Sequence, residues 1–346
     1  MPERFLVTGA YGCIGAWTVR QLVREGVEVI GVDADDDDHR VRELLDADEL
    51  AAARFVKADV SNPAEVADMF ALDPTHVIHL AALQVPGCRE NPVLGAQVNV
   101  VGTAALFAAA LAHGLASPIV YASSVAAFAA ADGDGHAPTD PSGPPATHYG
   151  VFKIANEGTA RVFALENSLA SIGLRPSVVY GPCRDTGLTS ATTAAMRAAA
   201  HDSDYTIPFG GSCEFQFAPD AAAAFIAAAR APFAGAAVLN IPGTPLAIEE
   251  VIAEIERVVP ESAGRIGFEG PQLPFPPALD SSRFRSVVGT VRLTPFPQGV
   301  AETVRHFRRS ANRAARDVRH AQSLVACGGR HTAAASDRSK GPPWPL

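Results

Sequence analysis

Residues 4–15 read Arg4-Phe-Leu-Val-Thr8-Gly9-Ala-Tyr-Gly12-Cys-Ile-Gly15, an apolar run followed by a loop with a glycine at every third position. The run is typical of a short strand, and the apolar residues after the loop repeat with the period of a helix. A strand, a glycine loop and a helix together form a dinucleotide-binding turn. The glycines allow a tight turn, a close backbone approach to a pyrophosphate and close packing of the helix, whose free N–H groups face the anion. This stretch predicts a nucleotide site lined by Gly9, Tyr11, Gly12, Cys13, Ile14 and Gly15.

A second apolar run, residues 28–32, ends in Asp33, 18 residues after Gly15. A carboxylate at this strand end accepts hydrogen bonds from both ribose hydroxyls and repels a 2′-phosphate. Four more carboxylates follow at residues 35–38, and we interpret them as a solvated loop that makes a phosphate still less favourable. The cofactor is therefore predicted to be NAD and not NADP.

Strand and helix patterns alternate as far as residue 182, which indicates an α/β fold of the Rossmann type, with a doubly wound parallel sheet. We predict an NAD-binding domain over residues 1–182 and a smaller substrate lobe over 183–309, with some segments of the lobe returning to the first domain. Residues 133–145 are interpreted as an exposed loop, and the basic segment 310–346 as a disordered tail. Strands are expected at 4–8, 28–33, 55–59, 76–82, 118–124 and 172–179.

Only three lysines occur in the chain, and one of them, Lys153, stands four residues after Tyr149. On a helix this spacing places both side chains on one face. An ammonium beside a phenol favours phenolate and lowers its pKa, which suits the pair to proton transfer. The alternative is a helix-surface pair without function.

Together, Thr-Gly-x-x-Gly-x-x-Gly and Tyr-x-x-x-Lys resemble the extended short-chain dehydrogenase/reductase family, which includes NAD-dependent epimerases and dehydratases. The resemblance covers residues 3 to 309. Further family segments occur in the expected order: Ala58-Asp-Val60, His79-Leu-Ala-Ala82, Asn99-Val-Val-Gly-Thr103, Tyr121-Ala-Ser-Ser124 and Arg175-Pro-Ser-Val-Val-Tyr-Gly-Pro182.

The resemblance implies roles for individual residues. Tyr149 would be the general acid and base, Lys153 would hold the nicotinamide ribose and lower the pKa of Tyr149, and Ser124 would bind the substrate oxygen. The cofactor would also contact a further set of residues: Asp33, Asp59, Val60, Ala81, Ala82, Leu83, Asn99, Ser123, Pro176 and Val178. For Ala81, Ala82 and Asn99, ordinary packing roles are the alternative.

Departures from the family pattern narrow the chemistry. Dehydratases have an Asp-Glu pair after the catalytic hydroxyl, where this chain has Val125 and Ala126. Nucleotide-sugar epimerases usually have a substrate-binding Asn where this chain has Val178, and an arginine for the diphosphate at a place that falls on Cys213, beside Glu214. Replacing that phosphate clamp with a thiol beside a carboxylate weakens anion binding. Both a 4,6-dehydratase and a nucleotide-sugar substrate are therefore disfavoured.

The expected function is an NAD-dependent oxidoreductase acting on a small hydroxy compound: a sugar, a sugar acid or a hydroxy acid. Arg184 is suited to a carboxylate, unless it pairs with its neighbour Asp185. The alternatives are an NAD-dependent sugar epimerase and a nucleotide sensor without turnover. The predicted substrate contacts are Gln84, Ser124, Val125, His148, Tyr149, Arg184, Thr186, Thr189 and Ser190.

Composition bears on partners and location. The net charge of −9 argues against nucleic acid or an anionic membrane as the main partner. The richest apolar stretch, around residues 98–111, falls short of the roughly 20 residues that span a bilayer. Five scattered cysteines without metal-type spacing suit free thiols in the cytoplasm, and no signal peptide or metal site is expected. The family resemblance suggests a homodimer formed through the helix that carries Tyr149 and the helix next to it.

Overall fold

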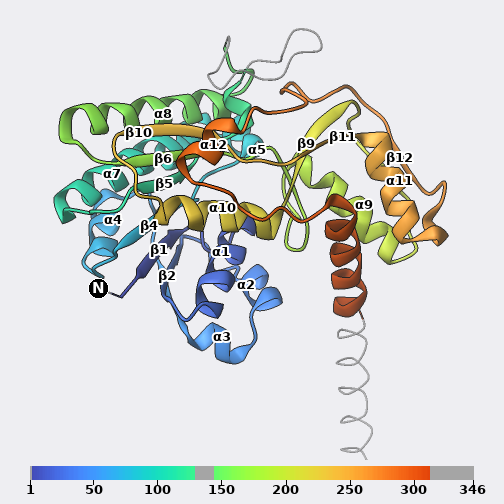
Figure 1. Cartoon of the computed structure of the whole chain (residues 1–346), viewed down its shortest axis with the longest axis horizontal. Coiled ribbons are helices and arrows are strands. Elements are labelled where there is room, and N and C mark those ends of the chain that lie inside the picture. The colour runs from blue at the N-terminus through green and yellow to red at the C-terminus, as the bar shows by residue number, and fades with distance from the viewer. Residues whose placement is uncertain (1, 129–143, 312–346) are drawn as a thin grey trace, which may run out of the picture.

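A parallel sheet of seven strands forms the centre of the computed structural model, which describes residues 2–128 and 144–311 (Figure 1). Every neighbouring pair is parallel, and the order is β10-β6-β5-β4-β1-β2-β3. The chain therefore switches direction across the sheet between β1 and β4, the point at which such sheets open a crevice at their carboxyl ends. The strands are β1 (Arg4–Thr8), β2 (Glu28–Asp33), β3 (Ala53–Lys57), β4 (His76–His79), β5 (Ile119–Ala122), β6 (Ser171–Arg175) and β10 (Ala236–Asn240). This confirms the predicted Rossmann-type fold.

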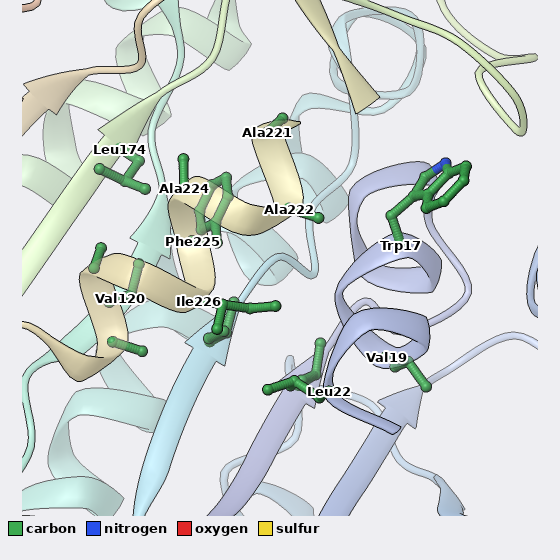
Figure 2. Close-up of a cluster of buried hydrophobic side chains, with 14 of the residues drawn as sticks. Trp17, Val19, Leu22, Val120, Leu174, Ala221, Ala222, Ala224, Phe225 and Ile226 are labelled. Atoms are coloured by element: carbon green, nitrogen blue, oxygen red, sulfur yellow. The ribbon is translucent and has the colours of Figure 1, made fainter. Parts of the chain in front are cut away.

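Helices cover both faces of this sheet because side chains alternate along each buried strand. From β1, Phe5 and Val7 join one apolar cluster, and Leu6 joins the cluster on the opposite face. Figure 2 shows part of the first cluster, where Ile226 of one helix lies near Leu22 of another. The helices of this face are α1 (Cys13–Arg24), α2 (His39–Leu44), α3 (Ala47–Ala51), α10 (Ala218–Arg230) and α12 (Ser282–Val287).

The opposite face carries the helix predicted to hold Tyr149 and Lys153, which runs from His148 to Asn167 as α8. The other helices of this face are α4 (Pro63–Phe70), α5 (Val85–Glu90), α6 (Pro92–Ala96) and α7 (Gly102–His113); α5, α6 and α7 contact α8, and α4 contacts α7. A π-helical segment, Gln97–Val101, joins α6 to α7. The whole run, Pro92–His113, is longer than the predicted apolar stretch, and by length and composition alone it passes for a membrane span. Leu106 and Phe107 are nevertheless fully buried in the cluster on this face of the sheet.

A second lobe surrounds a separate apolar cluster beside the carboxyl edge of the sheet. It contains the small sheets β11-β9-β7 and β12-β8. Its strands are β7 (Val178–Tyr180), β8 (Tyr205–Ile207), β9 (Ser212–Phe217), β11 (Thr244–Ala247) and β12 (Ile266–Phe268). Its helices are α9 (Ala191–Ala200) and α11 (Ile248–Val258), followed by a helical stretch over 296–311. Between them, α10 and β10 return to the large sheet and its covering helices.

One expected strand, 172–179, is divided in the structure. β6 ends at Arg175, and β7 begins at Val178 in the other sheet. Pro176 between them has no N–H to donate to a strand ladder, so the chain leaves the sheet there. Most of the loop predicted at 133–145, nearly all of the tail predicted at 310–346, and Cys327 lie outside the described residues.

Candidate functional site

The glycine loop lies at the carboxyl end of β1, directly against the end of β4. Gly9 has a φ of +70°, and a Cβ there would stand 2.6 Å from the nitrogen of Ala81. A Cβ on Gly15 would stand 2.0 Å from the carbonyl oxygen of Gly9. Gly12 caps α1 without a side-chain hydrogen bond, and the first turn contains no acid. The loop therefore requires glycine, and the N–H groups that open α1 stay available to an anion.

Asp33, at the end of β2, lies beside this loop. Its Oδ2 atom accepts a hydrogen bond of 2.9 Å from the N–H of Tyr11, and Oδ1 accepts one of 3.3 Å from Asp35. The carboxylate is therefore held against the glycine loop, and its remaining lone pairs suit ribose hydroxyls.

The ends of β3 and β4 contribute the next group of predicted cofactor residues. Asp59 accepts a 2.8 Å hydrogen bond from the N–H of Ser61, and Val60 packs against Gly102 of α7. Asn99 lies in the π-helical segment and bonds both the N–H and the carbonyl of Leu83, each at 2.9 Å. Asn99 therefore fixes the backbone that follows β4. Ala81 and Ala82 belong to this same stretch, next to Gly9.

The three predicted catalytic residues come together at the ends of β5 and α8. The Nζ atom of Lys153 donates a 2.7 Å hydrogen bond to the carbonyl of Ala122 and lies 5.2 Å from the centre of the Tyr149 ring. Ser124 accepts from the N–H of Ala126 at 3.1 Å, which fixes its hydroxyl at the start of a short 3-10 turn. Thr147 caps α8 by accepting a 3.0 Å bond from Gly150, so the helix that presents Tyr149 begins at a defined residue.

The electrostatics of this group differ from the sequence expectation. Burial raises the pKa of Tyr149 to about 12, while a hydrogen bond with Ser124 and the charge of Arg184 lower it. Burial also lowers the pKa of Lys153 to about 8. The expected depression of the Tyr149 pKa by Lys153 is absent here, because burial outweighs the favourable contacts and the ammonium is directed at a backbone carbonyl.

A buried ion pair supports the same helix, and sequence reasoning missed it. Glu157, one turn beyond Lys153, binds Arg175 at the end of β6 through two hydrogen bonds of 2.8 and 2.6 Å. Ser123 donates to the same carboxylate. The four-residue spacing from Lys153 to Glu157 was the available signal. The other predicted residues of this edge are Pro176, whose carbonyl accepts from Val125 at 3.1 Å, and Val178, which is fully buried in the second lobe.

Among the predicted substrate residues, Arg184, Thr189 and Gln84 converge. Arg184 donates to the hydroxyl of Thr189 at 2.8 Å. A Cβ on Gly187 would stand 2.5 Å from Oε1 of Gln84 and 3.7 Å from a terminal nitrogen of Arg184. The side chains of Gln84 and Arg184 therefore both lie beside Gly187. The suggested pairing of Arg184 with Asp185 does not occur. Asp185 instead binds Arg40, with bonds of 2.7 to 3.2 Å, and His39 at 2.9 Å.

Other predicted substrate residues lie in positions that are less suited to contact with a substrate beside Tyr149. Ser190 donates its hydroxyl proton to the carbonyl of Gly187 at 2.7 Å, and Thr186 is exposed. His148 stacks on Phe152 and borders a hollow of about 420 Å³ whose lining does not include Tyr149. Val125 is buried in a small apolar cluster with Phe128 and Leu279.

At the position where nucleotide-sugar epimerases have an arginine for the diphosphate, this chain has no positively charged side chain. Cys213 is buried in the apolar cluster of the second lobe. Glu214 is also buried and accepts a 2.6 Å bond from the N–H of Leu279, and burial raises its pKa to about 7. In the described part of the chain, no cluster of His, Cys, Asp and Glu is suited to a metal ion.

The doubly wound sheet, the glycine loop and the Tyr-x-x-x-Lys helix define an NAD-dependent enzyme of the extended short-chain dehydrogenase/reductase type. The chain belongs to the NAD dependent epimerase/dehydratase family, whose sequence model matches residues 5–241.

Similar proteins include several whose names specify UDP-sugars. UDP-glucose 4-epimerase of Mycolicibacterium smegmatis is 29% identical over 319 residues, which cover 88% of this chain and 98% of that protein. The solved structure of MoeE5 in complex with UDP-glucuronic acid and NAD is 26% identical, with a TM-score of 0.73 over 89% of this chain and 100% of that one. A partial consensus L-threonine 3-dehydrogenase has the same fold, with a TM-score of 0.78 at 23% identity over 89% of this chain and 100% of that one. The comparisons therefore do not support the sequence argument against a nucleotide sugar.

NAD is the cofactor of this enzyme family, and the crevice fits it. The loop has no room for side chains at Gly9 and Gly15, α1 directs free N–H groups outward, and Asp33 closes the end of β2. These features match a pyrophosphate and an unphosphorylated adenosine ribose.

Proposed function

We propose that the protein is an oxidoreductase that moves hydride between NAD and a carbinol carbon of a small hydroxy compound. The grouping of Ser124, Tyr149 and Lys153 at one edge of the sheet carries this proposal. The proposal is supported by the proximity of a phenol, a hydroxyl and an ammonium, because hydroxyl oxidation needs one proton acceptor and one group that holds the oxygen.

Each residue has a distinct task in this proposal. Ser124 holds the substrate oxygen, and Tyr149 takes its proton in oxidation and returns it in reduction. Lys153 holds the nicotinamide ribose. Bound NAD supplies the hydride acceptor. The predicted cofactor residues of the glycine loop and of the ends of β2, β3 and β4 line the dinucleotide in this proposal. Gln84, Arg184 and Thr189 line the substrate side of the cleft.

A small substrate is favoured over a nucleotide sugar by the second lobe. Cys213 and Glu214 are both buried, and neither offers a positive charge to a diphosphate. A diphosphate usually requires arginine or lysine, because its desolvation must be offset by charged hydrogen bonds.

Replacing Tyr149 with phenylalanine tests the assignment. We expect turnover with NAD to fall by roughly 10²- to 10⁴-fold, since only the proton acceptor is removed. NAD affinity should stay the same, because the ring is kept. NADH absorbance measured across a panel of sugars, aldonates and hydroxy acids reports turnover, and near-normal turnover in the variant contradicts the proposed role.

An NAD-dependent sugar epimerase is the second candidate, supported by the similarity to UDP-glucose 4-epimerase along nearly the whole of that protein. In this case NAD remains bound and is regenerated in each cycle. Interconversion of UDP-glucose and UDP-galactose without net NADH would favour this function. A sensor without turnover is disfavoured by the intact Ser124, Tyr149 and Lys153 group.

We infer a homodimer formed through α7 and α8, because their outer surfaces expose large apolar side chains. Leu165 is 71% exposed, and Val151, Val162, Val101 and Leu111 are exposed on the same two helices or the π-helical segment before α7. Large exposed apolar side chains gathered on neighbouring helices favour an interaction surface there. A cytoplasmic location is proposed from the free cysteines at 13, 88, 183 and 213, and the net charge of −9 speaks against nucleic acid as a partner.

A further inference from the structure

The guanidinium of Arg184 has hydrogen-bonding capacity that the described residues do not use. One terminal nitrogen donates to Thr189 at 2.8 Å. The Nε atom is buried and has no hydrogen-bond partner among the described residues. A buried guanidinium donor without an acceptor is costly, so a position like this one is suited to a ligand that brings an acceptor.

The carboxylate next to Arg184 in the chain is directed elsewhere. Asp185 binds two nitrogens of Arg40, the shortest bond being 2.7 Å, and it also binds His39 at 2.9 Å. Arg40 in turn donates to the carbonyl of Tyr11 at 2.9 Å. Asp185 is therefore anchored to the glycine loop by a bidentate ion pair and does not neutralise Arg184.

Arg184 is also close to the proposed reaction centre. Its charge is one of the influences that lower the pKa of Tyr149. Gly187, with a φ of +84°, allows Gln84 to approach the loop that contains Arg184. An anionic group bound here would lie near a substrate oxygen held by Ser124 and Tyr149.

We propose that Arg184 binds a carboxylate of the substrate, so that the substrate class is hydroxy acids, aldonates included. This inference rests on the proposed oxidoreductase function. One guanidinium fork matches one carboxylate through two parallel hydrogen bonds. A nucleoside diphosphate needs more positive charge, and the second place expected to supply it holds the buried Cys213. Thr189 acts as a positioning residue that orients the guanidinium. Arg40 holds Asp185 away from it.

The test compares acids with neutral compounds of equal chain length. Erythronate and gluconate are paired with erythritol and glucitol, and calorimetry measures their binding to the enzyme loaded with NADH, where no hydride transfer occurs. We expect Arg184→Gln to weaken binding of the acids by roughly 10- to 100-fold, as for loss of a charged hydrogen-bonded pair. Binding of the alditols and of NADH should change less than about twofold, because the guanidinium contacts only the carboxylate in this scheme.

Two further variants sharpen the result. Arg184→Lys keeps the charge but loses the fork, and it should recover only part of the affinity for the acids. Arg257→Gln removes an equal charge at an exposed site on α11, where the arginine pairs with Glu254, and it should leave every affinity unchanged.

The outcomes separate this proposal from the proposed reaction. If Arg184→Gln weakens the binding of acids and of alditols equally, the carboxylate proposal is overturned. It is also overturned if the variant loses affinity for NADH alone, because Arg184 would then belong to the cofactor site. Failure of both acids to bind the loaded wild-type enzyme also overturns it. Acid binding that depends on Arg184, without NADH formation from any hydroxy compound, contradicts the reaction but supports the carboxylate site.

Discussion

Lys153 is an ammonium in a place that water hardly reaches, with only 3% of its surface exposed. Burial disfavours its charge, and the nearby carboxylate of Glu157 compensates only in part. Among the described residues, its ammonium donates to one acceptor, the carbonyl of Ala122. Such a residue reduces folding stability and is retained where a positive charge is needed for function.

A pH-dependent stability measurement tests this strain. The pKa of Lys153 falls from 10.5 in the unfolded chain to about 8 in the fold. Between these values the unfolded chain binds more protons than the folded one, so this residue makes stability increase as pH rises from about 8 to 10.5. Relative to Lys153→Met, the wild-type protein should gain about 3 kcal/mol across this window in the absence of NAD. Urea unfolding of both proteins at several pH values measures it, and parallel profiles would contradict the burial of a charged lysine.

At the scale of single elements, α8 places the proposed catalytic residues Tyr149 and Lys153 on one face, because they are four residues apart. Glu157 follows at the same spacing. Glu157 ties the helix to β6 through Arg175, whose side chain is 1% exposed and which also lies over the ring of Phe128 at 4.4 Å. Ser123 adds a bond from β5. The ion pair therefore fixes how α8 lies against the two strands whose ends carry the site.

Replacing Glu157 with glutamine should destabilise the protein by about 3 kcal/mol, since it removes the carboxylate that faces a buried guanidinium. Turnover should also fall, because α8 would lose its fixed position over β5 and β6. Glu166→Gln, an exposed change on the same helix, is the matched control and should have almost no effect on stability. Thermal or urea unfolding measures both variants, and equal effects would show that the ion pair has no special role.

The sequence was informative wherever a local pattern decides the structure. The glycine loop, the helix that carries Tyr149 and Lys153, and the alternating elements of the sheet follow from spacing and periodicity, so they could be predicted. Contacts between distant segments could not. Nothing near Asp185 indicates that it pairs with Arg40, 145 residues away, and the break at Pro176 became clear only once two separate sheets were present. The pKa of Tyr149 was wrongly expected to be lowered because burial, the dominant cause, has no local signature.

At the scale of the whole molecule, most of the exposed large apolar side chains among the described residues lie on α6, α7, α8 and the π-helical segment. Val162 and Leu165 lie on α8, the helix that also carries Tyr149, with exposures of 45% and 71%. A dimer through this surface would pack the outer side of the catalytic helix against a partner, while its inner side remains against the sheet. Oligomer formation would then limit the motion of the helix that positions the proposed acid and base.

The double variant Val162→Glu/Leu165→Glu tests this arrangement. In a dimer, the two carboxylates on each copy would be buried in the interface beside those of the partner. Their desolvation and mutual repulsion should make the protein monomeric. The fold and the NAD affinity should be kept. Leu293→Glu changes an equally large apolar residue, 41% exposed, outside these helices, and it should leave the assembly unchanged. Sedimentation velocity gives the molecular mass of each variant, and circular dichroism verifies the fold. A double variant with the same mass as the wild-type protein would exclude α8 as the dimer surface. If the double variant is a monomer of unchanged stability but has reduced turnover, the interface limits the motion of the helix that carries Tyr149.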